Sequence, residues 1–202
     1  MKQKKGSKFG ILIAVLLIIL FGVMAAVMTV NFSIQRERSR AEEAALAAEA
    51  WALYNRIMER DLVSDYPQTP EAVMDFFNWT AFYIYGRPAK DPDDIRRVLF
   101  RQRELFTDEL LLLNPFEPTL AHLLESMEEL HARQIFATDI NRSTAYFYDL
   151  NNDHVAVIRS TIYLTGSPGS FDRDFYFVWV APPGGAAGHG RWKIEGWREN
   201  VG

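Results

Sequence analysis

The chain contains no cysteine among its 202 residues. Disulfide bonds, thiolate metal sites and cysteine nucleophiles are therefore excluded. This absence leaves the compartment open, because extracytoplasmic bacterial proteins often fold without disulfides. Histidine is also scarce, and the four that are present are the first residues to weigh for metal or acid–base chemistry.

Charge is absent from one long segment near the N-terminus, Phe9 to Val30, which holds 22 residues without Asp, Glu, Lys or Arg. As a helix it would be roughly 33 Å long, which matches a hydrocarbon core of about 30 Å. A helix satisfies its own backbone hydrogen bonds, so it needs no partner in lipid. We therefore expect a transmembrane helix that binds the lipid bilayer. The alternative is a signal peptide cleaved near Ala25, although signal peptides usually have a shorter apolar core of about 7–15 residues.

Basic residues flank this segment unequally. Four lysines lie within residues 1–8, whereas Arg36, Arg38 and Arg40 follow the segment. Because Lys and Arg favour the cytoplasmic side, we expect a single-pass cell-membrane protein with a cytoplasmic N-terminus and an extracellular C-terminal domain. The expected organisation is a cytoplasmic N-terminus (1–8), a transmembrane helix (9–30), a juxtamembrane helix (31–65) and a folded domain (66–202).

Acidic residues outnumber basic ones beyond the N-terminus. All 26 acids follow residue 8, whereas four of the 22 bases precede residue 9. The rest of the chain therefore has a net charge of about −8. An acidic folded part argues against nucleic acid as a partner.

Residues 39–62 are rich in alanine and have a helical pattern. Ser39 and Glu42 match a capping box at its start. The apolar stripe through Leu46 and Leu53 lasts about two heptads, fewer than the three or four that indicate a coiled coil. We expect this helix to pack on its own domain, with self-association through it as the alternative.

Three further helices are predicted from their start signals. Thr69 is a natural N-cap, and Pro70 is a natural first helical residue. Asp91 and Pro92 repeat this pattern, and acids follow at the positive end of the helix dipole. The expected helices are residues 70–86, 91–106 and 117–130, with a leucine run at 110–113 that Asn114-Pro115 closes.

After about Ile135 the apolar period changes from 3.6 to 2, which predicts β-strands. Helices followed by sequential strands predict an α+β fold, with three to four helices packed on one face of a four-stranded antiparallel sheet. The expected strands are Phe136 or Thr144 to Leu150, His154–Thr165, Phe171–Ala181 and Gly190–Arg198. The expected turns are Asn151–Asp153, Gly166–Gly169 and residues 181–190.

The histidines do not predict a metal site. His122 and His131 lie on one helix at every-third-residue spacing with Glu125 and Glu128. Two imidazoles share a helix face at a spacing of four residues, whereas here the direction drifts until the two rings lie nearly opposite. We expect a solvated polar face, no metal and no cofactor.

Tyr146, Arg159 and Asp174 are the polar strand residues that we single out as a possible pocket. A pocket enzyme would hold an ionisable side chain among apolar walls that shift its pKa. Both faces of each strand are partly apolar, so the sequence leaves open which face points inward. A structural ion pair or an exposed position is the competing interpretation, and no residue is identified as catalytic.

Four arginines, Arg96, Arg97, Arg101 and Arg103, form a basic group on the second predicted helix of the domain. Acidic residues interleave with them, so a salt-bridged helix surface explains them without a ligand. The many aromatic residues of the strands could line a pocket or a binding face, but they also suit a core between sheet and helices.

Three segments carry a resemblance to known families. They are Tyr66-Pro-Gln-Thr-Pro70, Leu105–Leu110 through Asn114-Pro115, and Gly190-Arg-Trp-Lys-Ile-Glu-Gly-Trp197. In this order, behind an N-terminal anchor, they resemble a family of unknown function made up of single-pass membrane proteins from clostridial-type Gram-positive bacteria. The last strand also resembles that of the nuclear-transport-factor-2-like superfamily, which implies a cone-like domain with a strongly curved sheet. Fold likeness of this kind implies no particular function.

Two functions follow as expectations. The first is a non-enzymatic interaction or assembly module of the cell envelope, tethered by its N-terminal helix and binding an envelope protein or a second copy of itself. The alternative is a small-ligand-binding or enzymatic pocket protein that uses the cavity of the cone. Two or more ionisable side chains that converge in an enclosed apolar cavity would favour the alternative.

Overall fold

A computed structural model of the chain describes residues 7–87, 90–150, 153–166, 169–181 and 190–200. Side chains are described over the same ranges except at residues 7–23, 25, 26, 150, 153 and 200. The chain divides into two compact units, Met1–Leu46 and Ala47–Gly202. The second unit holds the hydrophobic core and all of the strands.

Helix α1 runs from Ser7 to Glu59. It contains residues 9–30, the predicted membrane segment, most of whose side chains lie outside the described residues. Within the part of the chain that the structure describes, no helix meets the length and apolarity needed to span a bilayer. The last residues of α1 belong to the second unit, where Tyr54 and Ile57 are buried. This end of the predicted 39–62 helix therefore packs on its own domain, as expected.

Local capping chemistry fixes where the next helices begin. Helix α2 spans Pro70–Tyr85, and the hydroxyl of Thr69 accepts a 3.1 Å hydrogen bond from the amide of Ala72. Helix α3 spans Pro92–Arg103, where Asp91 accepts from the amide of Asp93 at 2.8 Å. Both predicted starts are confirmed. The leucine run forms a separate short helix, α4 (Asp108–Leu113), and α5 (Phe116–Ala132) follows it.

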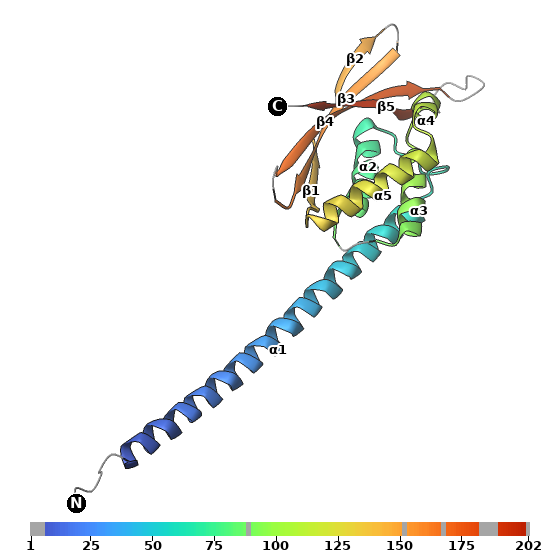
Figure 1. Cartoon of the computed structure of the whole chain (residues 1–202). Coiled ribbons are helices and arrows are strands. Elements are labelled where there is room, and N and C mark those ends of the chain that lie inside the picture. Colours follow the sequence, from blue (N-terminus) through green and yellow to red (C-terminus); the bar gives the residue numbers. More distant parts are fainter. Residues whose placement is uncertain (1–6, 88–89, 151–152, 167–168, 182–189, 201–202) are drawn as a thin grey trace, which may run out of the picture. The chain divides into compact units, whose positions relative to one another are not determined.

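The sheet has five strands instead of the predicted four. They are β1 (Ala137–Arg142), β2 (Tyr146–Leu150), β3 (Asp153–Leu164), β4 (Ser170–Val180) and β5 (Arg191–Asn200). All pairs are antiparallel, the order is β1-β3-β4-β5, and β2 also pairs with β3. Figure 1 shows this curved sheet with α2 to α5 gathered on one side of it. The predicted α+β architecture is therefore confirmed, although the sheet does not close.

The fifth strand arises because the first predicted strand is interrupted at residues 143–145. The amide of Ser143 still bonds to the carbonyl of Arg159 at 2.9 Å, but the amide of Ala145 turns to the Glu71 carboxylate at 3.0 Å. Glu71, in the first turn of α2, thus replaces the acceptor that a strand would supply. The residues on either side pair with successive parts of β3.

Three predicted turns cannot be compared with the structure. Residues 151–152, 167–168 and 182–189, which form most of these turns, lie outside the described residues.

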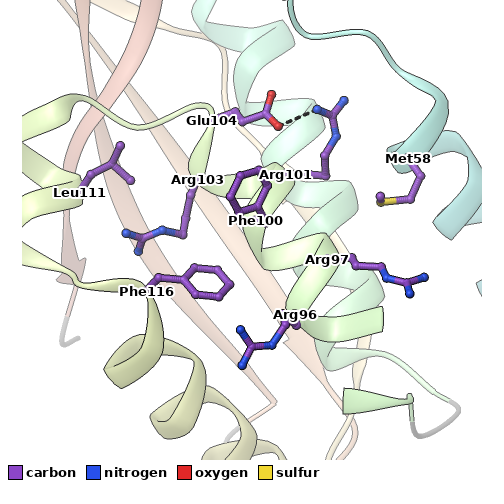
Figure 2. Close-up of a pocket in the computed structure, with 9 residues that line it drawn as sticks. All are labelled: Met58, Arg96, Arg97, Phe100, Arg101, Arg103, Glu104, Leu111 and Phe116. Atoms are coloured by element: carbon purple, nitrogen blue, oxygen red, sulfur yellow. Dashed lines mark hydrogen bonds and ion pairs between the residues drawn. The ribbon is translucent and has the colours of Figure 1, made fainter. Parts of the chain in front are cut away.

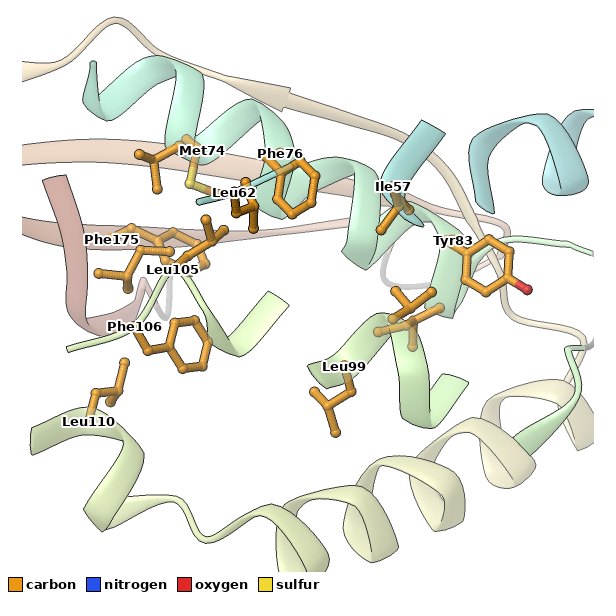
Figure 3. Close-up of a cluster of buried hydrophobic side chains, with 14 of the residues drawn as sticks. Ile57, Leu62, Met74, Phe76, Tyr83, Leu99, Leu105, Phe106, Leu110 and Phe175 are labelled. Atoms are coloured by element: carbon orange, nitrogen blue, oxygen red, sulfur yellow. The ribbon is translucent and has the colours of Figure 1, made fainter. Parts of the chain in front are cut away.

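The inward face of the sheet carries Ala156 and Ile158 on β3 and Phe175 and Phe177 on β4, each at most 3% exposed. These side chains meet the helices in one hydrophobic core, part of which Figure 3 shows. Residues that contribute to it from the helices and loops include Ile57, Leu62, Met74, Phe76, Tyr83, Leu99, Leu105, Phe106 and Leu110.

The edge strand β5 is covered by the connection between α3 and α4. The amide of Ile194 donates to the carbonyl of Leu105 at 2.8 Å, and the amide of Thr107 donates to the carbonyl of Ile194 at 3.0 Å. This backbone pairing ties the loop that ends α3 to the sheet. It also places the C-terminal end of α3 beside the sheet, where the sites below are found.

Candidate functional site

Tyr146, Arg159 and Asp174 come together on the outer face of the sheet, away from the helices. They line a shallow depression of about 450 Å³. Arg159 and Asp174 form a cross-strand ion pair, with 2.8 Å between Nε and Oδ1, and the hydrogen bond to Asp174 raises the pKa of the Arg159 guanidinium. Tyr146 is 71% exposed. These three residues therefore form an open polar surface and are not part of an enclosed pocket.

A partly enclosed cavity lies instead between the helices and the inner face of the sheet. Its volume is about 160 Å³. Aromatic side chains from α2, from the α3–α4 connection and from the last two strands form much of its wall: Phe77, Phe106, Phe175 and Trp197. Ala81, Ile84, Leu99, Leu123 and Ile162 complete the apolar part.

Two arginines, Arg103 at the end of α3 and Arg173 on β4, also line this cavity. Arg103 is 9% exposed, and its Nη1 is buried without a hydrogen-bond partner among the described residues. Arg173 pairs through Nη2 with Glu199 at 2.7 Å, while its Nε is likewise buried and unpartnered within the described part of the chain. The described lining residues include neither Asp nor Glu. The cavity is therefore apolar with a positive lining.

The remaining polar groups of the cavity are neutral. Burial raises the pKa of the Tyr85 hydroxyl, an effect that nearby Arg173 partly offsets. Gln102 donates from Nε2 to the hydroxyl of Thr80 at 2.8 Å, and Asn114 donates to the carbonyl of Leu110 at 3.0 Å. The two amide groups are thus held in place by the fold, whereas the phenol stays protonated and able to donate.

A second candidate site is a groove of about 740 Å³ on the outer side of α3. Figure 2 shows Phe100 in its middle, with Met58 of α1 on one side and Leu111 and Phe116 on the other. Phe100 is 61% exposed, and its ring meets that of Phe116 edge-on at 6.2 Å. We call this surface the α3 groove. Its floor is apolar and open to solvent.

Three of the four arginines predicted to form a salt-bridged helix surface do so along the α3 groove. Arg96 makes a bidentate pair with Glu117, at 2.8 and 3.0 Å. Arg101 pairs with Glu104 at 2.6 Å. The third, Arg97, approaches Asp94 to 3.8 Å and donates to the Tyr54 hydroxyl. The prediction is therefore confirmed for these three.

Arg103 departs from that prediction. No acid in the described residues pairs with it, and its guanidinium carbon lies 5.6 Å from the centre of the Phe116 ring. Burial lowers the pKa of the Arg103 side chain. Because it lines both the α3 groove and the cavity, it lies at the boundary between them.

The histidines that the structure describes lie in different surroundings. The side chain of His122 is 83% exposed, whereas the ring of His131 lies beside that of Phe136, tilted by 39°, with ring centroids 5.1 Å apart. His154 pairs with Asp149 at 2.8 Å on the surface. No cluster of metal-ligating side chains occurs in the described residues. The fourth histidine, His189, lies outside them.

Sequence reasoning missed the two arginines of the cavity. Arg103 and Arg173 lie 70 positions apart and on different kinds of element, so no local motif joins them. A weak signal did exist for Arg173, because it shares strand parity with Phe175 and Phe177. The polar residues predicted from the strands, Arg159 and Asp174, lie on the opposite face of the sheet.

A family model described as Domain of unknown function (DUF6715) matches residues 1–197. No curated protein and no solved structure matches the chain.

Proposed function

We propose that this chain, which belongs to the DUF6715 family of unknown function, is a membrane-anchored binding protein of the cell envelope. Its folded unit would dock an amphipathic segment of another envelope protein in the α3 groove. The observation that carries the proposal is the exposed Phe100 at the centre of that apolar groove.

The groove has the composition of a docking surface. Aromatic side chains in a central apolar patch often dominate binding energy, and large exposed apolar patches on a folded unit mark interaction sites. The exposed residues Leu112 and Leu113 of α4, at 80% and 74%, extend the apolar character beside it. A helix that presents apolar side chains at helical spacing would cover this surface.

The arginines of the α3 groove favour a partner segment that carries acidic residues beside its apolar side chains. An arginine has five N–H donors, and a carboxylate partner uses at most two or three of them. Arg97 therefore keeps donors beyond those given to Tyr54 and Asp94, whereas Arg101 also donates to the carbonyl of Arg60, and Arg103 faces no acid among the described residues. A partner carboxylate near Arg103 would remove an uncompensated buried charge, which would favour the bound state.

The membrane anchor rests on residues 9–30. They lack charge, and helical backbone continues through them within α1. Lysines at positions 2, 4, 5 and 8 support a cytoplasmic N-terminus and an extracellular domain. The likeness to clostridial single-pass proteins and to the nuclear-transport-factor-2-like cone belongs to the same proposal, supported by the curved sheet with helices over one face.

Photo-crosslinking at position 100 tests the docking proposal. A p-benzoylphenylalanine at Phe100 of the full chain, in its native cells, is expected to crosslink to a second protein. Mass spectrometry of the adduct should identify an apolar peptide with Asp or Glu beside it. The matched control is the same residue at Phe147, which is 56% exposed on β2 and should give no such adduct.

Two outcomes contradict docking of another protein. Equal adducts from positions 100 and 147 would show nonspecific contact. A crosslink between two copies of the chain, seen as an adduct of twice the chain's mass, would assign the groove to self-association, whereas a crosslink within one chain to Met58, which also lines the groove, decides nothing between the two. Replacing Phe100 should change the free energy of unfolding by at most about 0.5 kcal/mol, because the side chain is mostly exposed, so the chain that carries the crosslinker at position 100 should stay folded.

A second candidate function, small-ligand binding, is supported by the cavity. Arg103 and Arg173 both line a partly enclosed space with mostly apolar walls, and two ionisable groups in one apolar cavity favour the pocket alternative. This function would use the inner side of α3, whereas docking would use its outer side, and both would draw on Arg103, which lines both spaces.

A further inference from the structure

We propose that the cavity binds a small carboxylic acid with an apolar body of about the size of a benzene ring, and that Arg103 holds its carboxylate. The inference rests on the second candidate function and names the ligand class. It involves no covalent step.

The size and walls of the cavity set the body of the ligand. An apolar cavity of about 150 Å³ can accept a benzene molecule, and this one measures about 160 Å³. Phe77, Phe106, Phe175 and Trp197 supply aromatic faces and edges around it. A flat ring or a short branched chain fits such walls, whereas a sugar or a nucleotide would exceed the volume and leave polar groups unpaired.

The charge of the residues that line the cavity indicates which charged group the ligand carries. The described lining residues contain two arginines and no acid. Across the described part of the chain, four buried side-chain nitrogen atoms have no hydrogen-bond partner, and two of them, Arg103 Nη1 and Arg173 Nε, belong to residues that line this cavity. A buried N–H without an acceptor is costly, and a carboxylate supplies acceptors together with the opposite charge.

Arg103 is the stronger anchor of the two. Arg173 already has Glu199 as an acid partner at 2.7 Å. Arg103 has none among the described residues, and 9% exposure leaves little access to water that could replace one. Tyr85 adds a neutral hydroxyl, because burial raises its pKa. One planar anion with one apolar body therefore matches the lining better than a doubly charged phosphate.

The experiment measures binding of benzoate to the full chain in detergent micelles by isothermal titration calorimetry. Benzamide, which has the same shape without the charge, and inorganic phosphate, which has charge without the apolar body, are titrated in parallel. A charge-assisted hydrogen bond contributes about 1.5–3 kcal/mol, so benzoate should bind roughly 10-fold to 100-fold more tightly than benzamide.

Arg103→Met tests the anchor. Methionine keeps an unbranched apolar stem and removes the guanidinium, so benzoate affinity should fall by about 10-fold or more while benzamide affinity changes by less than about 3-fold. The control is Arg96→Met, which removes an arginine that lines the α3 groove but not the cavity. This variant should bind benzoate as the unchanged chain does.

Each result has one meaning. Tight benzoate binding that depends on Arg103 and exceeds benzamide binding supports the proposal. Equal affinity for benzoate and benzamide, unchanged in Arg103→Met, overturns the charge assignment but leaves a ligand-binding cavity. Phosphate that binds as tightly as benzoate overturns the carboxylic-acid class. No binding of benzoate or benzamide overturns both this inference and the second candidate function.

Discussion

The hydroxyl of Ser160 in β3 donates a 3.1 Å hydrogen bond to Oδ1 of Asn78 in α2, 82 positions earlier in the chain. Both side chains are buried, at 2% and 7% exposure. The bond joins the inner face of the sheet to the helix that covers it. A slide of the helix along the strand would leave two buried polar groups without partners, so this pair fixes the register between the two layers.

Ser160→Ala should therefore lower the free energy of unfolding by about 1–2 kcal/mol, because the Asn78 oxygen would lose its donor while staying buried. Urea denaturation followed by circular dichroism would measure the change. Ser170→Ala, at an exposed strand start, is the matched control and should stay within about 0.5 kcal/mol. Equal effects of the two substitutions would show that the hydrogen bond does not stabilise the register.

Two glycines of the last strand segment provide a matched test of packing. A Cβ on Gly190 would lie 2.3 Å from the Trp179 ring, whereas a Cβ on Gly196 would meet no atom within 4 Å. Gly190→Ala should destabilise the chain by about 1–3 kcal/mol, since Trp179 and its neighbour Trp192 must move. Gly196→Ala should be neutral or slightly stabilising. Thermal denaturation of the two variants compares them, and a larger loss at Gly196 would contradict the packing described.

Arg103→Met should stabilise the ligand-free chain. The substitution removes a buried cation that has no acid partner in the described residues and places an apolar side chain beside Phe116. We expect a gain of about 1–2 kcal/mol in the free energy of unfolding. The control Arg96→Met removes the solvent-exposed pair with Glu117 and should leave the free energy of unfolding nearly unchanged. A loss of stability in Arg103→Met would mean that the guanidinium has a structural partner.

Lys90 makes the free energy of unfolding depend on pH in the alkaline range. Burial lowers the pKa of its ammonium from 10.5 to about 8. At this group the unfolded chain therefore binds more protons than the folded chain between about pH 8 and 10.5, so the contribution of Lys90 to stability rises with pH. Tyr83, whose ring lies 5.1 Å from the ammonium, has its pKa raised from 10.0 to about 12 by burial, so from about pH 10 upward its contribution to stability falls and opposes that of Lys90. His131 titrates below the range of Lys90, since burial lowers its pKa from 6.5.

Lys90→Met should therefore be more stable than the unchanged chain at pH 7, by an amount on the order of 1 kcal/mol after allowance for solvent screening. The difference should shrink as pH rises from 8 to 10. Urea midpoints measured at pH 7, 8, 9 and 10 would show this trend. A difference that grows over the same range would have the wrong sign for a lysine whose pKa is lowered by folding.

The helices of the domain were predictable because their signals are local. Thr69 and Asp91 cap their helices through hydrogen bonds to residues two or three positions away. A proline follows each cap, where its missing N–H leaves no bond unmade. Such chemistry depends on a few neighbouring residues, so the sequence alone specifies where α2 and α3 begin.

The split of the first strand and the inward face of the sheet depend on distant residues. Ala145 leaves the ladder because its amide reaches Glu71, 74 positions earlier. The inner face of β3 carries Ala156, Ile158 and Ser160, which are less apolar as a set than a core usually is. The alternation of residues along the strand could not show that this face is buried, because burial depends on the helices that cover it.

The cavity was unpredictable for the same reason. Arg103 follows three arginines that do form ion pairs, and its sequence neighbours give no sign that it lacks an acid partner. Its burial results from the turn after α3, where the backbone of Leu105 pairs with Ile194 of β5. The site therefore depends on tertiary packing, which local patterns do not encode.

Protease access to a C-terminal tag on intact cells tests the tethered, outward-facing domain most directly. Residues 9–30 would hold the chain in the membrane, and the lysines before them would keep the N-terminus inside. We predict that protease removes the tag from intact cells while the N-terminal part stays in the membrane fraction. A tag that is cleaved after lysis but protected in intact cells would contradict the proposed orientation, and with it the docking of an envelope partner.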